Sequence, residues 1–174
     1  WFAASNARNT ALCLCNTTHI AYVDDLSVLM PGWLDNALDA ANGNTIVLGA
    51  YQKVNDLVVE NGEVKSFTDI PDGHDSRFSK GHRKCKGDLL FGCSLVAPVE
   101  ALLTVGGWPE ELCDGLGFED VCMGNVLQRA GCQFVYNPAM MTYESNELHF
   151  VEQPFRREDW HFENGQPARG GNGA

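Results

Sequence analysis

Positive charge is scarce in this sequence. The 174 residues contain 12 Lys and Arg against 23 Asp and Glu, which gives a formal net charge of −11 at pH 7. Proteins that bind nucleic acids generally neutralise phosphates with a surplus of Lys and Arg, so the composition argues against a nucleic-acid partner. The sequence also lacks a run of about 18 uninterrupted apolar residues, so we expect no membrane span in this chain.

Paired cysteine motifs are missing as well. The seven cysteines include no C-x-x-C pair, which disfavours both a redox pair and a structural zinc site. Most of the cysteines lie in apolar stretches, as buried reduced thiols do, and no segment near Trp1 resembles a signal peptide. We therefore expect a cytoplasmic protein.

Three nucleotide-binding and catalytic motifs are also absent. The sequence contains no G-x-S-x-G, no G-x-x-x-x-G-K phosphate loop and no G-x-G-x-x-G. These absences disfavour serine hydrolases, P-loop nucleotidases and dinucleotide-dependent oxidoreductases.

Helix-like and strand-like patterns alternate along the chain. The spacing of apolar and capping residues predicts helices over residues 5–15, 32–42, 98–105 and 118–131. Apolar runs predict strands over residues 19–25, 45–54, 87–97 and 132–137, and Asn61-Gly62 predicts the turn of a hairpin. The alternation indicates an α/β fold with a mixed sheet, formed by residues 1–151 as one domain and followed by a polar tail over residues 152–174.

Residues 77–86 form a basic segment in this acidic chain. The segment contains five Lys and Arg residues, and it lies within residues 69–86, which show no periodicity and are predicted to form a long loop. The basic segment is either a solvated part of that loop or a site for a small polyanion such as a diphosphate.

Two pairs of adjacent acids stand out. Asp24 and Asp25 form the end of an apolar strand, where burial penalises charge unless another group stabilises it. Glu119 and Asp120 begin a predicted helix, where acids complement the helix dipole, so an isolated pair there could serve only as a cap.

Three segments in fixed order resemble motifs of glycosyltransferases with the GT-A fold, chiefly the family 2 group and its galactosyltransferase-like relatives. They are A-R-N-T-A-L from Ala7, Y-V-D-D-L-S-V-L-M-P-G-W-L from Tyr22, and the block from Ala101 to Gly131 that contains V-G-G-W and G-F-E-D. The resemblance implies a mixed central sheet flanked by helices. It also implies transfer of a sugar from a nucleoside-diphosphate sugar donor to a hydroxyl of a carbohydrate or other acceptor, with inversion.

The resemblance assigns roles on the acceptor side of the site. Asp120 would be the general base that takes the proton of the acceptor hydroxyl, and Glu119 would orient the acceptor. Gly106, Gly107 and Trp108 would contact the acceptor or the sugar. For Trp108, stacking on a sugar face and ordinary packing are both open.

The resemblance assigns the donor side to the first acidic pair. Asp24 and Asp25 would contact the donor, with Asp25 holding a divalent cation, Mn²⁺ or Mg²⁺, against the diphosphate. Arg8 and Asn9 would lie near the nucleotide.

The sequence departs from the family at the metal site and at its beginning. Leu26 replaces the third acid of the family's acidic motif, Glu144 stands where the family often has a histidine, and His149 lies a few residues further on as a second metal ligand or a surface residue. The chain also starts at the A-R-N helix, so we expect it to lack the family's first βα units, roughly 60 residues. Two alternatives therefore stay open: a non-catalytic sugar or sugar-nucleotide binding domain, and a nucleotidyltransferase of similar fold.

Overall fold

The computed structural model describes residues 4–112, 118–146, 160–163 and 166–169. The helices are α1 (Ala4–Leu14), α2 (Trp33–Ala40), α3 (Val99–Thr104) and α4 (Phe118–Arg129), and η1 (Gly87–Leu89) and η2 (Glu110–Leu112) are short 3₁₀ turns. The strands are β1 (His19–Val23), β2 (Ser27–Leu29), β3 (Thr45–Glu60), β4 (Glu63–His74), β5 (Arg83–Cys85), β6 (Ser94–Pro98), β7 (Gln133–Ser145), β8 (Trp160–Glu163) and β9 (Gln166–Arg169).

The main sheet is mixed, as the sequence predicts. Its strand order is β1-β6-β3-β7-β2, with β4 added to β3 and β5 added to β7. Strands β3 and β7 pair in parallel, whereas β6 runs antiparallel to both β1 and β3. Strands β1, β3 and β7 therefore run in the same direction, and Asp24 follows the carboxyl end of β1.

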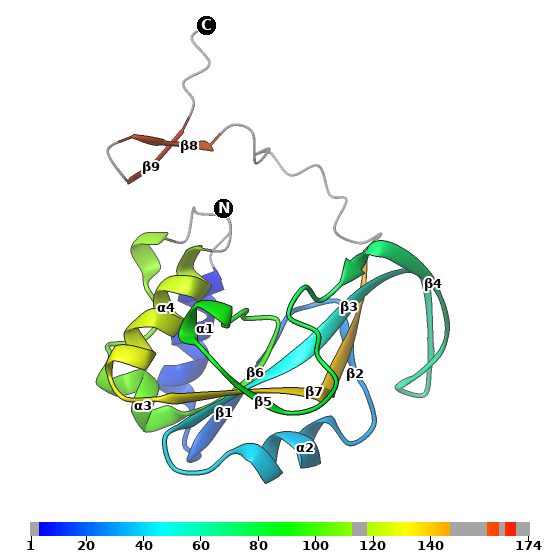
Figure 1. Ribbon diagram of the computed structural model, residues 1–174, viewed down its shortest axis with the longest axis horizontal. Helices are drawn as coiled ribbons and strands as arrows, with labels where there is room; N and C mark the ends of the chain where they lie inside the picture. The colour runs from blue at the N-terminus through cyan, green and yellow to red at the C-terminus, as the bar shows by residue number, and fades with distance from the viewer. Residues whose placement is uncertain (1–3, 113–117, 147–159, 164–165, 170–174) are drawn as a thin grey trace, which may run out of the picture.

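Helices cover both faces of this sheet, which makes three layers (Figure 1). One face carries the larger core, in which Ile46 and Leu48 of β3 belong to the same cluster as Leu102 of α3 and Leu127 of α4. On the other face, Val47 packs in the cluster that contains Trp33 of α2. The alternation of Ile46, Val47 and Leu48 between faces follows from the two-residue repeat of a strand.

The resemblance to GT-A glycosyltransferases implies that residues 19–25 form a central strand, but β1 lies at the edge of the sheet. Within the described residues it pairs on one side only, with β6. Its position at the edge follows from the order of the later strands, because β6, β3, β7 and β2 are all added on that same side.

Residues 69–86 are not one long loop, which corrects a second prediction. Strand β4 continues to His74, and residues 83–85 form β5 along β7. Arg77 of the basic segment is only 3% exposed, so it is part of the interior and cannot be a surface ligand for a diphosphate. The interior accepts this charge because Asp75 lies beside it.

The predicted polar tail, residues 152–174, contains secondary structure in its described part. Strands β8 and β9 pair antiparallel with each other in a separate two-stranded sheet.

Candidate active site

Arg8 of α1 brings Asp24 together with Glu119 and Asp120. Its guanidinium donates a hydrogen bond of 2.7 Å from Nη1 to Oδ1 of Asp120. The same guanidinium lies 3.7 Å from an oxygen of Glu119 and 3.8 Å from an oxygen of Asp24. The Arg8 side chain is 12% exposed, so these ion pairs lie in a largely desolvated environment, where charge interactions are stronger than in bulk water. The first-turn acids of α4 and the acid after β1 thus share one cation.

Asn9, the next residue of α1, holds the loop that follows α3. Its amide Nδ2 donates to the carbonyl oxygen of Trp108 at 2.9 Å, and its Oδ1 accepts from the amide of Trp108 at 2.7 Å. Gly107 has a φ of +84°, and a Cβ there would lie 2.7 Å from Oδ1 of Asn9. This position therefore needs a glycine, both for its backbone conformation and for the close approach of Asn9.

Trp108 is buried, with 2% of its surface exposed. The guanidinium of Arg8 lies over its ring, 4.4 Å from the centroid, and Tyr22 of β1 meets it edge-on at 5.5 Å. Of the two open readings of Trp108, the geometry favours packing, because no exposed ring face is left for a sugar. A cation over an indole face is stabilised by the ring quadrupole, so Trp108 helps to fix Arg8 in the site.

Asp120 is held from two sides. While Oδ1 accepts from Arg8, Oδ2 accepts from the backbone amide of Gly92 at 2.7 Å. A carboxylate has about four lone-pair sites, so two remain, and 15% of the side chain is exposed. Glu119 is 2% exposed and close to Arg8. It is therefore better placed to orient Arg8 than to contact an acceptor.

Asp24 and Asp25 differ in their surroundings. The backbone amide of Asp24 donates to the carbonyl oxygen of Cys93 at 3.2 Å, which fixes the chain at the end of β1. Burial raises the pKa of the Asp24 carboxyl, and the negative charge of Glu144 raises it further, whereas Arg8 lowers it. Asp25 is exposed, and Leu26 after it has a φ of 61°, an unusual backbone conformation for a residue with a side chain.

Two residues of the site were not singled out as site residues in the sequence. Glu144 of β7 is 2% exposed and lies close enough to Asp24 to affect its pKa. Gly92 carries the amide that holds Asp120, and a Cβ there would lie 2.0 Å from Nη2 of Arg8. An isolated glycine inside an apolar strand-like run is a signal of such a close approach, and it could have indicated this position.

The described residues do not form a ready-made site for the expected divalent cation. No group of three or more His, Cys, Asp or Glu side chains suited to a metal occurs in the part of the chain that the structure describes. His149, one of the two predicted ligands, lies outside the described residues. Burial and, after it, the negative charge of Glu144 raise the pKa of the Asp24 carboxyl, while Arg8 lowers it.

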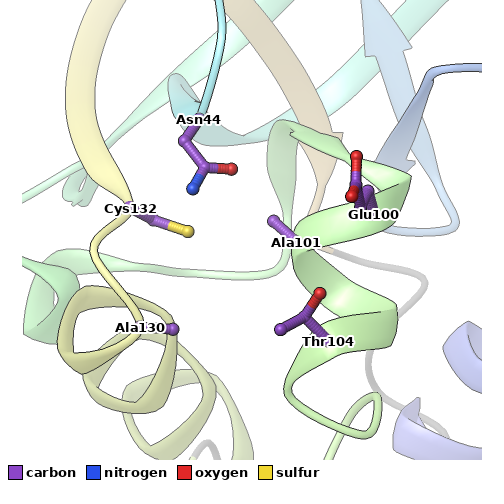
Figure 2. A pocket seen from close by; sticks show the side chains of 6 residues that line it. All are labelled: Asn44, Glu100, Ala101, Thr104, Ala130 and Cys132. Atoms are coloured by element: carbon purple, nitrogen blue, oxygen red, sulfur yellow. The ribbon is translucent and has the colours of Figure 1, made fainter.

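A hollow of about 230 Å³ lies elsewhere, between α3 and the turn that joins α4 to β7 (Figure 2). Asn44, Glu100, Thr104 and Cys132 line it. Asn44 precedes β3, so the hollow lies toward the amino end of that strand, and none of the predicted site residues lines it.

The arrangement of strands and helices is that of a GT-A-like fold. The crystal structure of GalNAc-T7 with UDP, GalNAc and Mn²⁺ is similar to this chain, with a TM-score of 0.58, 11% sequence identity and 83% of this chain covered. The chain spans 30% of the length of that structure. At this identity the similarity shows the fold alone, and it does not point to family 2 in particular.

The other comparisons give no match. No family model and no curated protein matches the sequence. Among the described residues, none of the helices is long and apolar enough to cross a membrane.

Proposed function

We propose that this protein transfers a sugar from a nucleoside-diphosphate sugar to an acceptor hydroxyl, with inversion at the anomeric carbon. The observation that carries the proposal is the convergence of Asp24, Glu119 and Asp120 on Arg8, next to the carboxyl end of β1. Ligands of open α/β sheets bind at such strand ends. The GT-A-like fold adds support, since GalNAc-T7, which shares it, was solved with UDP, GalNAc and Mn²⁺.

Asp120 is the general base in this proposal. The acceptor oxygen attacks the anomeric carbon, its proton passes to Asp120, and the bond from the anomeric carbon to the diphosphate oxygen breaks as the nucleoside diphosphate leaves. A base of this kind must lie within about 3 Å of the hydroxyl. The hydrogen bonds from Arg8 and Gly92 fix the direction of the carboxylate before the acceptor binds.

Asp24 and Asp25 form the donor side. A divalent cation, Mn²⁺ or Mg²⁺, held by Asp25 would neutralise charge on the leaving diphosphate. With Leu26 in place of a further acid, we expect the protein to bind that cation weakly until nucleotide oxygens complete its coordination. Arg8 and Asn9 act beneath this site by fixing the acids and the Gly107-Trp108 loop.

A transfer assay with a panel of nucleoside-diphosphate sugars and Mn²⁺ tests the proposal. We expect release of nucleoside diphosphate that depends on an acceptor, and a rate that falls 10²- to 10⁴-fold in Asp120→Asn. Donor affinity should stay within a few-fold, because Asp120 acts on the acceptor.

The two alternatives appear as different outcomes of the same assay. Donor binding without turnover would identify a binding domain, and pyrophosphate release from a nucleoside triphosphate would identify a nucleotidyltransferase. An Asp120→Asn variant as fast as the parent protein would show that the acid is only a helix cap.

A further inference from the structure

Arg77 and Asp75 form an ion pair in the interior of the protein. The sequence instead predicts that this part of the chain is a loop. The side chains are 1% and 0% exposed. Nε and Nη2 of Arg77 donate to the two carboxylate oxygens of Asp75 at 2.9 and 2.8 Å. This is the two-pronged geometry in which a guanidinium binds a carboxylate most strongly.

The remaining donors of Arg77 reach two separate parts of the chain. Nη1 donates to the carbonyl oxygen of Leu89 at 2.9 Å, and Nη2 donates to the carbonyl oxygen of Gly49 in β3 at 2.9 Å. The guanidinium also lies over the ring of Phe91, 4.2 Å from its centroid. Arg77 therefore contacts residues 89–91 at two points and links them to β3, the central strand of the sheet.

The next two residues contact the candidate active site. Gly92 donates its amide to Asp120, and Cys93 accepts the amide of Asp24. Arg77 thus contacts the beginning of the short segment of residues 89–93. The end of the same segment is hydrogen-bonded to Asp120 and Asp24.

We propose that Arg77, held by Asp75, is a positioning residue for the active site. It fixes residues 89–93 so that the amide of Gly92 directs the carboxylate of Asp120. The inference rests on the proposed function for its catalytic consequence, but the positioning itself can be measured in the free protein.

The first measurement is hydrogen exchange of the Gly92 amide in the unaltered protein, followed by NMR. The resonance is identified by sequential assignment and by its change in Asp120→Asn. We expect it to exchange at least 10-fold more slowly than the amide of Gly81, an exposed glycine within the basic segment. Equal exchange of the two amides would overturn the proposal without any variant.

Two variants then remove the hydrogen bonds of Arg77 in different ways. Arg77→Lys keeps the charge but cannot reach Asp75, Leu89 and Gly49 together. The double variant Asp75→Leu/Arg77→Met removes both charges at once, so no charge is left buried alone, and such replacements often keep the fold. We expect faster exchange at Gly92 in both variants, and a turnover per folded molecule that is lower by up to about 10²-fold.

The control is Glu63→Gln/Lys65→Gln, which removes an exposed ion pair on β4. It should leave both the exchange at Gly92 and the turnover unchanged. Unaltered exchange at Gly92 in folded Arg77→Lys would overturn the positioning role. Faster exchange in the variants together with no turnover in the parent protein on any donor would instead refute the proposed function and leave the positioning intact.

Discussion

Replacing Arg8 by methionine should destabilise the fold by an amount that depends on pH. Nitrogen–oxygen distances of 2.7 Å to Asp120, 3.7 Å to Glu119 and 3.8 Å to Asp24 define its ion pairs. With an effective dielectric constant of about 20, the shortest contact contributes about 6 kcal/mol and each of the others about 4 kcal/mol before desolvation. Methionine keeps much of the apolar volume over Trp108, so the change removes mainly charge.

The net loss is much smaller than the sum of these contacts. Desolvation of Arg8 offsets most of the attraction, and Asp24 contributes least because 39% of its side chain is exposed and solvent screens it. Removing one partner of a largely buried ion pair typically costs about 3–5 kcal/mol. We therefore expect Arg8→Met to lower the free energy of unfolding by about 3 kcal/mol at pH 8, the lower end of that range.

The loss should shrink as the pH falls. Arg8 lowers the pKa of Asp24, so its removal raises that pKa further above the value in the unfolded chain. A carboxyl whose pKa is raised by folding binds more protons in the folded state, so its contribution to stability is present at low pH and is lost as pH rises through the raised pKa. Protonated Asp24 also no longer needs the cation.

Urea unfolding at pH 5 and pH 8, followed by tryptophan fluorescence, measures both effects. Arg8→Lys is the matched control, since it keeps the charge and loses the planar fork, and it should fall between the parent protein and Arg8→Met. A loss below about 1 kcal/mol at pH 8, or the same loss at both pH values, would refute the reasoning that Arg8 is the shared counter-ion of the acids.

Two further predictions concern Asp24 and the packing of α4. Asp24→Asn should raise the free energy of unfolding at pH 8, because burial and Glu144 raise the pKa of Asp24. The gain should disappear near about pH 3, where the acid is mostly protonated in both the folded and the unfolded chain. Urea unfolding at the two pH values checks this prediction, and a loss of stability at pH 8 would contradict it. Gly124→Ala should cost about 3 kcal/mol or more, because a Cβ at Gly124 would lie 1.9 Å from the carbonyl oxygen of Gly87 and would push α4 away from η1; thermal unfolding measures the cost, with Gly62→Ala as a strained but uncrowded comparison.

Local patterns were enough to predict most helices and the hairpin. The turn at Asn61 and Gly62 is confirmed, with φ angles of 53° and 79°, because the turn requires conformations that these two residues adopt at low cost. Apolar spacing likewise predicted the helix over residues 32–42, and Trp33 on it is 3% exposed. These features depend on residues close together in the chain.

The features that sequence patterns missed depend on contacts between distant residues. In the sequence, Arg77 is one of several cations in the basic segment. Its burial depends on the carbonyl oxygens of Gly49 and Leu89, which lie in other elements and accept its hydrogen bonds. The edge position of β1 depends on the order of strands in the sheet, which local patterns do not specify. The motifs indicated which residues to examine as one site. They did not indicate that the side chain of Asn9 forms hydrogen bonds with the backbone of Trp108, 99 positions further along the chain.

The most direct test of the central claim is the anomeric configuration of the first product, read by ¹H NMR as sugar transfer proceeds. A single displacement assisted by Asp120 predicts a product whose configuration is opposite to that of the donor sugar, formed together with one nucleoside diphosphate. A product of retained configuration, or no transfer of sugar from any nucleoside-diphosphate donor, would contradict the account.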